Sequence, residues 1–486
     1  MDQHLGEYLG IEADWSLDGD ATEAVEVISP HTGRPIARVA AAGPADVDAA
    51  VGAARAAVDG GPWPRLDPAE RIAAVRRLAE IYTARRGDMA SLISAEMGAP
   101  ITFAQRAQVG LPTTMMAAFC SLAETYPWHE VRAGYFGSDV HVRRDPVGVV
   151  AAVVPWNMPQ FLIVTKLVPA LLAGCAVVLK PAPETTLDAL LLAQMLQEVG
   201  LPEGVVSVLP GDAAVGARLV GHPGIDKVSF TGSSAAGRAV AAAAAANLAK
   251  VSLELGGKSA AIILDDADPE TVAAGIRSAS LSNSGQICNA LTRIVVPAAR
   301  EQEFVDALAA RMGALVVGDP ADPATELGPL VSRRQQQRVR DYIDLGQREG
   351  ARLVCGGSDL PDGLDTGWYV RPTLFSGANN TMRIAREEIF GPVLTVIAYR
   401  DEDDAVAIAN DSDYGLAGSV WTADTERGIR IAERVQTGTF GVNQGYTMDP
   451  FAPFGGVKDS GYGRELGREG IDGYVETKSI AVATAR

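Results

Sequence analysis

In the middle of the chain, two kinds of segment alternate, which differ in how hydrophobic and polar positions are spaced. Short continuous apolar runs, such as "VGVVAAVVPW" and "CAVVLKP", are typical of strands buried on both faces of a sheet. Longer segments with helical periodicity, "QFLIVTKLVPALLAG" and "LDALLLAQMLQEVG", follow them and end at Gly174 and Gly200, where a glycine favours helix termination. The alternation continues through "IDKVSFTG" and "AAGRAVAAAAAANLA" and predicts a parallel sheet covered by helices on both faces.

Other segments have patterns of their own. Residues 66–126 have helical periodicity, whereas residues 129–145 hold a "GSD" turn signal between two short alternating runs, which favours a two-stranded arm. A second series of strands and helices begins at "AAIILDDAD" and predicts a second α/β domain. The tail "GYVETKSIAVATA" alternates as an edge or arm strand would.

The turns after the predicted parallel strands are the first places to look for a site. Ligands of such sheets bind at the carboxyl ends of the strands, which share one edge. In this chain that edge is predicted to carry the segments Pro155–Asn157 and Thr231–Ser233 together with Lys180 and Gly211.

Composition narrows the classes of function. The net charge is −18 over 486 residues, which disfavours binding to nucleic acid or to an anionic membrane surface. The four cysteines lie far apart with no CxxC pair, so we expect neither a metal site nor a disulfide framework. The acidic N-terminus "MDQHLGEYLG" does not resemble a signal peptide, and "LVPALLAGCAVVL" is too short to span a bilayer. We therefore expect a cytoplasmic protein.

Two glycine-containing motifs are compatible with anion binding or with catalysis. "FTGSSAAG" follows a strand and opens a helix, so the amides after Gly232 could bind an anion, although an ordinary turn has the same pattern. "LELGGKSA" is not a P-loop, because the position that requires glycine holds Ser252. Glu254, between two leucines at a strand end, is either a general base with a raised pKa or an ion-paired structural residue.

Cys288, in "NSGQICNAL", is a candidate nucleophile. A reactive cysteine needs a partner, and none of the five histidines lies in a catalytic context, so a cysteine–histidine hydrolase is poorly supported. Glu254 is the best candidate for the base. Asn157, in "PWNMP", could donate its amide to an oxyanion or could cap a helix.

Seven motifs, taken in order, resemble the aldehyde dehydrogenase superfamily: "PWNMP", "KPAPETT", "FTGSS", "LELGGKS", "GQIC", "EEIFGPV" and "PFGGVKDSGYGRELGREG". The resemblance runs from about residue 20 to the end of the chain. It implies two doubly wound α/β domains and a small β arm for oligomerisation. The implied cofactor-binding domain spans residues 1–128 and 146–255, the catalytic domain residues 256–460, and the arm residues 129–145 and 461–486.

The same resemblance implies roles for individual residues. Cys288 would be the nucleophile, Glu254 the general base, Asn157 an oxyanion donor and Lys166 part of a proton relay. The implied cofactor-binding residues are Pro155, Trp156, Lys180, Gly211, Gly232, Ser233, Glu388 and Phe390. Glu254 favours hydrolysis of the acyl enzyme, because relatives that transfer the acyl group to coenzyme A commonly lack this glutamate. That transferase and a non-catalytic homologue remain the alternatives.

Two departures from the family pattern concern the cofactor. Pro183 stands where an acidic residue usually binds the adenine ribose, and Glu184 follows it. "SSAAG" also lacks the acid that usually follows the phosphate-loop motif. We expect NAD, with NADP as the alternative.

The substrate and the assembly are less constrained. The segment "NQGYTMDPFAPFGG" contains no arginine, so we expect an uncharged apolar aldehyde rather than one that bears a carboxylate. The residues predicted for an apolar tunnel are Met115, Met116, Met158, Phe161, Ile287, Tyr446, Met448 and Phe451. Exposed arm strands favour a homodimer or homotetramer.

Overall fold

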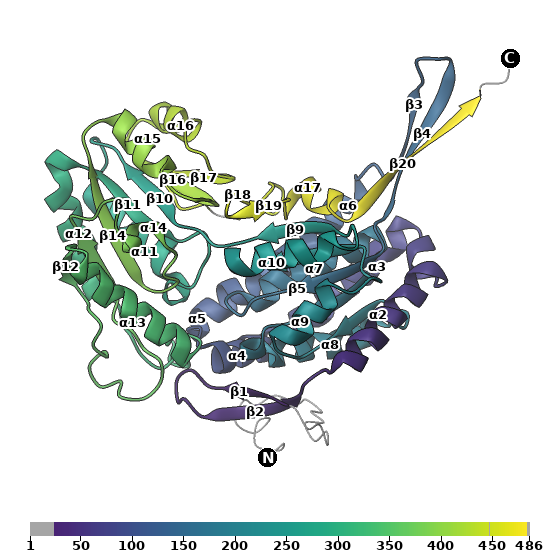
Figure 1. Ribbon diagram of the computed structural model, residues 1–486, viewed down its shortest axis with the longest axis horizontal. Helices are drawn as coiled ribbons and strands as arrows, with labels where there is room; N and C mark the ends of the chain where they lie inside the picture. The colour runs from purple at the N-terminus through teal and green to yellow at the C-terminus, as the bar shows by residue number, and fades with distance from the viewer. Residues whose placement is uncertain (1–23, 447, 484–486) are drawn as a thin grey trace.

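The computed structural model describes residues 24–446 and 448–483, which form two α/β lobes and an arm that projects from one of them (Figure 1). The predicted fold class, two α/β domains with a small β arm, is confirmed. The ends of the predicted domains, residues 1–23 and 484–486, lie outside the described residues.

The first lobe is built on a six-stranded sheet with the order β19-β9-β8-β5-β6-β7. Its strands from β5 to β9 are parallel, and β19 is antiparallel to β9. The chain runs from β5 outward to β7 and then returns to β8 on the other side of β5. This reversal opens a crevice at the carboxyl ends of β5 and β8, where such sheets bind ligands. The strands are β5 (Val149–Val153), β6 (Ala176–Lys180), β7 (Val206–Val208), β8 (Lys227–Thr231), β9 (Lys250–Glu254) and β19 (Gly461–Tyr462).

Helices cover both faces of this sheet, as the apolar strand runs predict. Val150 and Ala152 of β5 pack in one core cluster, and Val149 and Ala151 pack in another, because successive side chains of a strand point to opposite faces. The first cluster includes α3 (Pro68–Ala84), α4 (Arg86–Met97), α6 (Gly110–Glu124), α7 (Pro159–Ala173) and α8 (Leu187–Val199). The second includes α2 (Pro44–Asp59), α9 (Ala213–Val220) and α10 (Ser234–Ala245).

The second lobe holds a seven-stranded sheet with the order β12-β13-β14-β11-β10-β16-β17, parallel except for β12. Its strands are β10 (Ser259–Ile263), β11 (Leu291–Pro297), β12 (Arg352–Cys355), β13 (Thr373–Ser376), β14 (Val393–Tyr399), β16 (Ala417–Trp421) and β17 (Thr439–Val442). Its helices are α11 (Pro269–Leu281), α12 (Glu301–Gly313), α13 (Arg333–Arg348), α14 (Arg383–Arg386), α15 (Glu402–Asn410) and α16 (Thr425–Ala432). The short segment of residues 255–258 connects β9 of the first sheet to β10 of the second.

The arm has three strands, the hairpin that the turn signal predicts and the alternating tail that the sequence predicts as an edge or arm strand. β3 (His129–Ala133) and β4 (Ser138–Pro146) form the expected hairpin, and β20 (Val475–Ala483) pairs with β4 along its whole length. In Figure 1 this sheet extends away from both lobes. The residues just before β20 are part of the first lobe instead, because β19 pairs with β9 and α17 (Gly467–Asp472) packs on α6 and α7.

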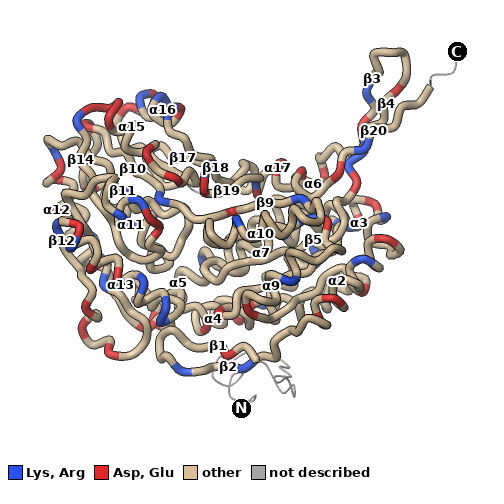
Figure 2. Tube along the Cα trace, viewed as in Figure 1, with Lys and Arg blue, Asp and Glu red and all other residues tan. Residues whose placement is uncertain are grey.

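Shorter elements complete the described chain. β1 (Ala24–Ile28) pairs with β2 (Pro35–Ala40), and β15 (Tyr414–Gly415) pairs with β18 (Val457–Lys458). α5 (Ile101–Phe103) continues into a π-helical turn, Ala104–Gln108, before α6 begins. Basic and acidic residues are interspersed along the helices (Figure 2). Within residues 24–446 and 448–483, no helix combines the length and apolar character needed to cross a bilayer.

Candidate active site

A cavity of about 560 Å³ opens at the crevice between β5 and β8 and extends to the second lobe. Its wall combines the turns after these two strands with the segment that holds Cys288 and the "EEIFGPV" segment. The lining residues are Pro155, Trp156, Asn157, Leu162, Thr231, Gly232, Ser233, Leu255, Gly256, Cys288, Arg334, Gln335, Arg338, Glu388 and Phe390. The structure therefore brings together most of the residues that the sequence singles out, from segments far apart in the chain.

The backbone before Cys288 forms a left-handed turn. Asn283, Ser284 and Gly285 have φ angles of 54°, 57° and 74°. Gly285 is required there, because a Cβ atom at this position would lie 2.3 Å from the carbonyl oxygen of Gly391. Phe390, next to Gly391, also has a positive φ of 65°. Non-glycine residues in the left-handed region cost conformational free energy, and they cluster at functional sites. The strained backbone of these two adjoining segments is therefore typical of a functional site.

Asn157 holds the turn after β5 against the segment that carries Cys288. Its side-chain amide donates to the carbonyl oxygen of Gln286 at 3.0 Å, and its own carbonyl accepts from Gln108 at 2.8 Å and from Asn283 at 2.9 Å. The N-cap of α7 is Met158, so Asn157 is not the cap of that helix. One amide hydrogen of Asn157 is left for another acceptor.

Cys288 and Glu254 lie close enough to influence one another. Burial raises the pKa of the Cys288 thiol to about 12, and the carboxylates of Glu388 and Glu254 contribute to this shift. Burial and the charge of Glu465 raise the pKa of Glu254 well above its usual range, and Lys166 and Arg464 oppose that shift. Neither carboxylate oxygen of Glu254 has a hydrogen-bond partner among the described residues. Glu254 is therefore not the ion-paired structural residue that the sequence left open.

A buried ion pair lies behind Glu254. Lys166 donates to Glu465 Oε1 at 2.5 Å and to the hydroxyl of Thr231 at 2.7 Å, and Thr165 donates to Glu465 Oε2 at 2.9 Å. Both members of the pair are almost inaccessible to solvent. Glu465 is a residue that the sequence analysis missed, although it lies within the quoted motif "GRELGREG".

Three residues shape the cavity where it meets the second lobe. The rings of Trp156 and Phe390 meet edge to face, with centroids 5.4 Å apart. Glu388 Oε1 accepts the backbone N–H of Gly257 at 3.0 Å, and burial raises the pKa of Glu388 to about 7. A Cβ atom at residue 256 would lie 2.4 Å from Glu388 Oε2, so a glycine is needed for this contact.

The edge near α10 has features of a phosphate and ribose site. Ser233 is the N-cap of α10, and its hydroxyl accepts the N–H of Ala236 at 3.3 Å. Because Gly232 and Ser233 also line the cavity, the N-terminus of α10 lies at its wall, where a helix terminus favours an anion. Lys180 and Gly211 are not among the residues that line this cavity, although Lys180 ends β6 and Gly211 lies just after the neighbouring β7. Burial lowers the pKa of Lys180 to about 8, and the charge of Glu184 opposes that shift.

A second cavity, of about 510 Å³, lies on the other side of the cysteine, because the two neighbours of Cys288 line it. Its wall is formed by Phe103, Arg106, Ala107, Leu111, Met158, Thr271, Gly275, Ser278, Ala279, Ser282, Ile287, Asn289, Trp421, Asn443, Gln444, Gly445, Tyr446 and Met448. Of the residues predicted for a tunnel, Met158, Ile287, Tyr446 and Met448 lie in this wall. The structure places the others elsewhere: Met115, Met116 and Phe161 are in the core, and Phe451 is 59% exposed.

Several lining residues come from segments to which the sequence analysis assigned no site. Arg334, Gln335 and Arg338 reach the first cavity from the start of α13, and Arg338 donates to the carbonyl oxygen of Glu388 at 2.6 Å. Phe103 reaches the second cavity from the end of α5, and Arg106 reaches it from the π-helical turn that follows. These residues follow no strand end and carry no motif, so no local signal indicates their role.

Comparisons with known proteins agree with this arrangement. Residues 16–480 match the model of the aldehyde dehydrogenase family. The geranial dehydrogenase of Castellaniella defragrans is 47% identical over 460 residues, which are 95% of each chain. The crystal structure of a Mycobacterium tuberculosis aldehyde dehydrogenase complexed with NAD+ has 48% identity and a TM-score of 0.93, and the match covers 98% of this chain and 97% of that one. Aldehyde dehydrogenase C of Pseudomonas syringae, crystallised as a mutant with NAD+ and octanal, has 43% identity and a TM-score of 0.92, with 96% and 94% covered.

The family model spans nearly the whole chain, and the relatives align over nearly their full lengths. The ordered motifs, the crevice between the lobes and these matches lead to one conclusion. The protein belongs to the aldehyde dehydrogenase family.

Proposed function

We propose that this aldehyde dehydrogenase uses Cys288 as its nucleophile and Glu254 as the base that activates water. The observation that carries the proposal is a buried carboxylate without a hydrogen-bond partner among the described residues, beside a cysteine that stands between two cavities. In this family an aldehyde is oxidised to a carboxylic acid and a hydride passes to a nicotinamide. When bound, the dinucleotide supplies the hydride acceptor.

Cys288 attacks the aldehyde carbon and forms a hemithioacetal. The free amide hydrogen of Asn157 and the backbone N–H of Cys288 are the donors for its oxyanion, and each such donor contributes about 3 kcal/mol. Asn157 is suited to this role because two hydrogen bonds to the cysteine segment and a third from Gln108 already fix its position. Loss of hydride then leaves a thioester on the sulfur.

Hydrolysis of the thioester is assigned to Glu254. Because burial raises its pKa, this carboxyl can accept a proton from water more readily than an exposed glutamate. Lys166 and Glu465, which form an ion pair behind it, are the groups through which the proton can leave. Six residues that line the first cavity are proposed to hold the dinucleotide: Pro155, Trp156, Gly232, Ser233, Glu388 and Phe390. Lys180 and Gly211 are proposed for the same role because they lie at the carboxyl ends of the neighbouring strands β6 and β7.

We propose NAD rather than NADP as the cofactor. The cleft fits a dinucleotide, because the N-cap of α10, an aromatic pair and the carboxylate of Glu388 line one cavity of about 560 Å³. Glu184 is close enough to influence the pKa of Lys180, and its negative charge would repel a 2′-phosphate. The structures from Mycobacterium tuberculosis and Pseudomonas syringae, whose complexes contain NAD+, support the same choice.

The proposed substrate is an aldehyde with a hydrocarbon chain or ring next to the reactive carbon. Phe103, Leu111, Met158, Ile287 and Tyr446 offer apolar surface in the second cavity. The relatives support this class, since one is named for geranial and another was crystallised with octanal.

The assembly, the location and the domain boundaries are also proposals. The projecting arm favours a homodimer or homotetramer. The described cysteines are all free, which is consistent with a reducing compartment such as the cytoplasm. Two α/β sheets that meet at residues 255–258 support a boundary between the cofactor and catalytic domains near residue 255.

The test is an absorbance assay for the reduced nicotinamide with a panel of aldehydes and with NAD or NADP. We expect NAD-dependent oxidation of octanal and geranial that needs no coenzyme A and is abolished in Cys288→Ala. Acyl transfer that requires coenzyme A would contradict the role of Glu254, and full activity of Cys288→Ala would contradict the nucleophile.

A further inference from the structure

The second cavity contains a single charged side chain in its described wall, that of Arg106. Every other lining residue is apolar, or is a neutral hydroxyl or amide. Because the whole chain has 60 acidic and 42 basic residues, an arginine in a wall without any carboxylate is unexpected. A cationic group in an otherwise neutral cavity attracts the anionic part of a ligand.

The position of Arg106 is set by the backbone on which it stands. It lies in the π-helical turn Ala104–Gln108, and such turns occur frequently at functional sites. Gln108, at the end of the same turn, donates to the carbonyl oxygen of Asn157 at 2.8 Å. The turn that carries the guanidinium is therefore attached to the residue beside the nucleophile.

The guanidinium of Arg106 is available to a ligand. Its side chain is exposed, and within residues 24–446 and 448–483 no hydrogen bond or ion pair engages it. Several other arginines have partners, for example Arg338 with the carbonyl oxygen of Glu388 and Arg427 with Asp265. Arg106 thus has five N–H donors in a planar fork, the geometry that binds a carboxylate in two places.

We propose that Arg106 binds a carboxylate at the far end of the substrate. The preferred substrate is then an ω-oxo carboxylate, in which a hydrocarbon spacer separates the aldehyde from the anionic group. This inference rests on the proposed function, because the aldehyde carbon must lie at Cys288 while the spacer lies along the apolar wall. The segment before the last motif contains no arginine and therefore predicts an uncharged aldehyde. Arg106 comes from a different segment of the wall, so the preferred substrate changes to one that bears a carboxylate.

The chemistry of the wall agrees with such a substrate. Apolar side chains, including Leu111, Met158 and Trp421, can cover the spacer, whereas no side chain there except Arg106 can compensate a negative charge. A neutral aldehyde of the same length would fill the same space without the contact to Arg106. The carboxylate therefore adds affinity before the chemical step, which lowers KM more than it changes kcat.

The experiment compares octanal with the eight-carbon ω-oxo carboxylate in the complete enzyme with NAD. In Arg106→Gln we expect kcat/KM for the oxo carboxylate to fall about tenfold, mainly through KM, with octanal changed less than about twofold. Arg106→Lys keeps the charge without the fork and should restore part of the loss. High salt should reduce the difference between the substrates in the wild type.

A matched control and a second readout make the result decisive. Arg86→Gln removes the same charge from an exposed site on α4 outside the cavity and should change neither substrate. Calorimetric titration with octanedioate should give binding to the wild type that Arg106→Gln weakens about tenfold. An equal loss for both aldehydes, or octanedioate binding that is unaffected by the substitution, would overturn the inference. Octanedioate binding that depends on Arg106 in an enzyme that oxidises neither aldehyde would overturn the proposed function alone.

Discussion

At the scale of single residues, the site brings together a proposed nucleophile, Cys288, and a proposed base, Glu254, whose pKa values are both raised. Burial keeps the Cys288 thiol protonated in the protein alone, with its pKa raised to about 12. Glu254 has a raised pKa as well, so it can take a proton that an ordinary glutamate would leave in water. Because its pKa is raised, the sulfur of Cys288 stays a thiol in the protein alone, and its conversion to a thiolate requires the other groups of the site.

The Glu254→Gln variant tests the base. We expect hydrolysis of the thioester to slow by about 10²- to 10⁴-fold, because glutamine cannot accept the proton of water. The acyl enzyme should accumulate, and mass spectrometry after rapid quenching measures it. Because the pKa of Glu254 is raised, its carboxylate form and the rate of hydrolysis in the wild type should increase with pH through that raised value, and the variant should lack this increase.

Glu469→Gln is the matched control for this substitution, since Glu469 is exposed on α17. It should keep the rate and the pH profile of the wild type. If Glu254→Gln retained the rise of hydrolysis with pH and accumulated no acyl enzyme, the assignment of the base would be wrong.

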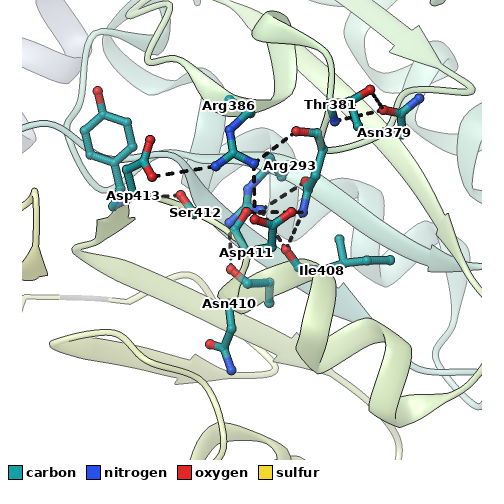
Figure 3. A network of polar contacts seen from close by, with 12 residues as sticks. Arg293, Asn379, Thr381, Arg386, Ile408, Asn410, Asp411, Ser412 and Asp413 are labelled. Atoms are coloured by element: carbon teal, nitrogen blue, oxygen red, sulfur yellow. Dashed lines mark hydrogen bonds and ion pairs between the residues drawn. The ribbon is translucent and has the colours of Figure 1, made fainter.

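At the scale of elements, the link between the two sheets is held by a buried arginine. Arg293, in β11, donates to the carbonyl oxygen of Lys258 at 2.8 Å and to those of Ile408 and Ala409 near the end of α15, both at 2.9 Å. Figure 3 shows Arg293 beside Ile408 and Asp411 in a wider polar network. Burial lowers the pKa of Arg293 to about 10. Gly257, just before Lys258, donates its N–H to Glu388 at 3.0 Å, and a Cβ atom on it would lie 2.4 Å from the carbonyl oxygen of Cys288, so this network supports a segment packed against the site.

Arg293→Met tests the importance of this network. The substitution leaves several buried carbonyl groups without donors, and we expect the free energy of unfolding to fall by about 3 kcal/mol. Denaturation in urea, followed by circular dichroism, measures the change. Arg348→Met, at an exposed position of α13, should change stability by less than about 0.5 kcal/mol. Equal stability of the two variants would show that Arg293 contributes little to the fold.

At the scale of the whole molecule, the arm carries several exposed large apolar side chains. Tyr135 and Phe136, between β3 and β4, are 96% and 94% exposed, and Val482 of β20 is 44% exposed. Figure 1 shows the arm standing clear of both lobes. Apolar side chains and a free strand edge favour pairing with another copy of the chain.

The double variant Tyr135→Ser with Phe136→Ser tests this role. We expect the assembly to dissociate into smaller species because the apolar contact area of the arm is lost. Light scattering after size-exclusion chromatography measures the mass. The control is Leu248→Ser, which removes an apolar side chain that is 92% exposed at the end of the segment after α10. An unchanged mass in the double variant would exclude the hairpin tip from the assembly contact.

Local patterns in the sequence determined the central sheet and the edge of it that lines the first cavity. The apolar runs and the glycines predict α7 and α8 closely, because helix and strand periods are properties of neighbouring residues. The turns after β5 and β8 could be placed in one crevice, since parallel strands align their carboxyl ends. Motifs that combine in one order were enough to indicate Cys288 and Glu254 as a pair.

Only the tertiary structure decided which distant segments meet. It set the register of β20 on β4 in the arm, placed Glu465 against Lys166, put Arg106 in the wall of the second cavity, and left Phe451 exposed. Residues hundreds of positions apart leave no periodic trace of such contacts in one sequence. Their contacts depend on how the lobes pack together, and that packing is a property of the whole chain.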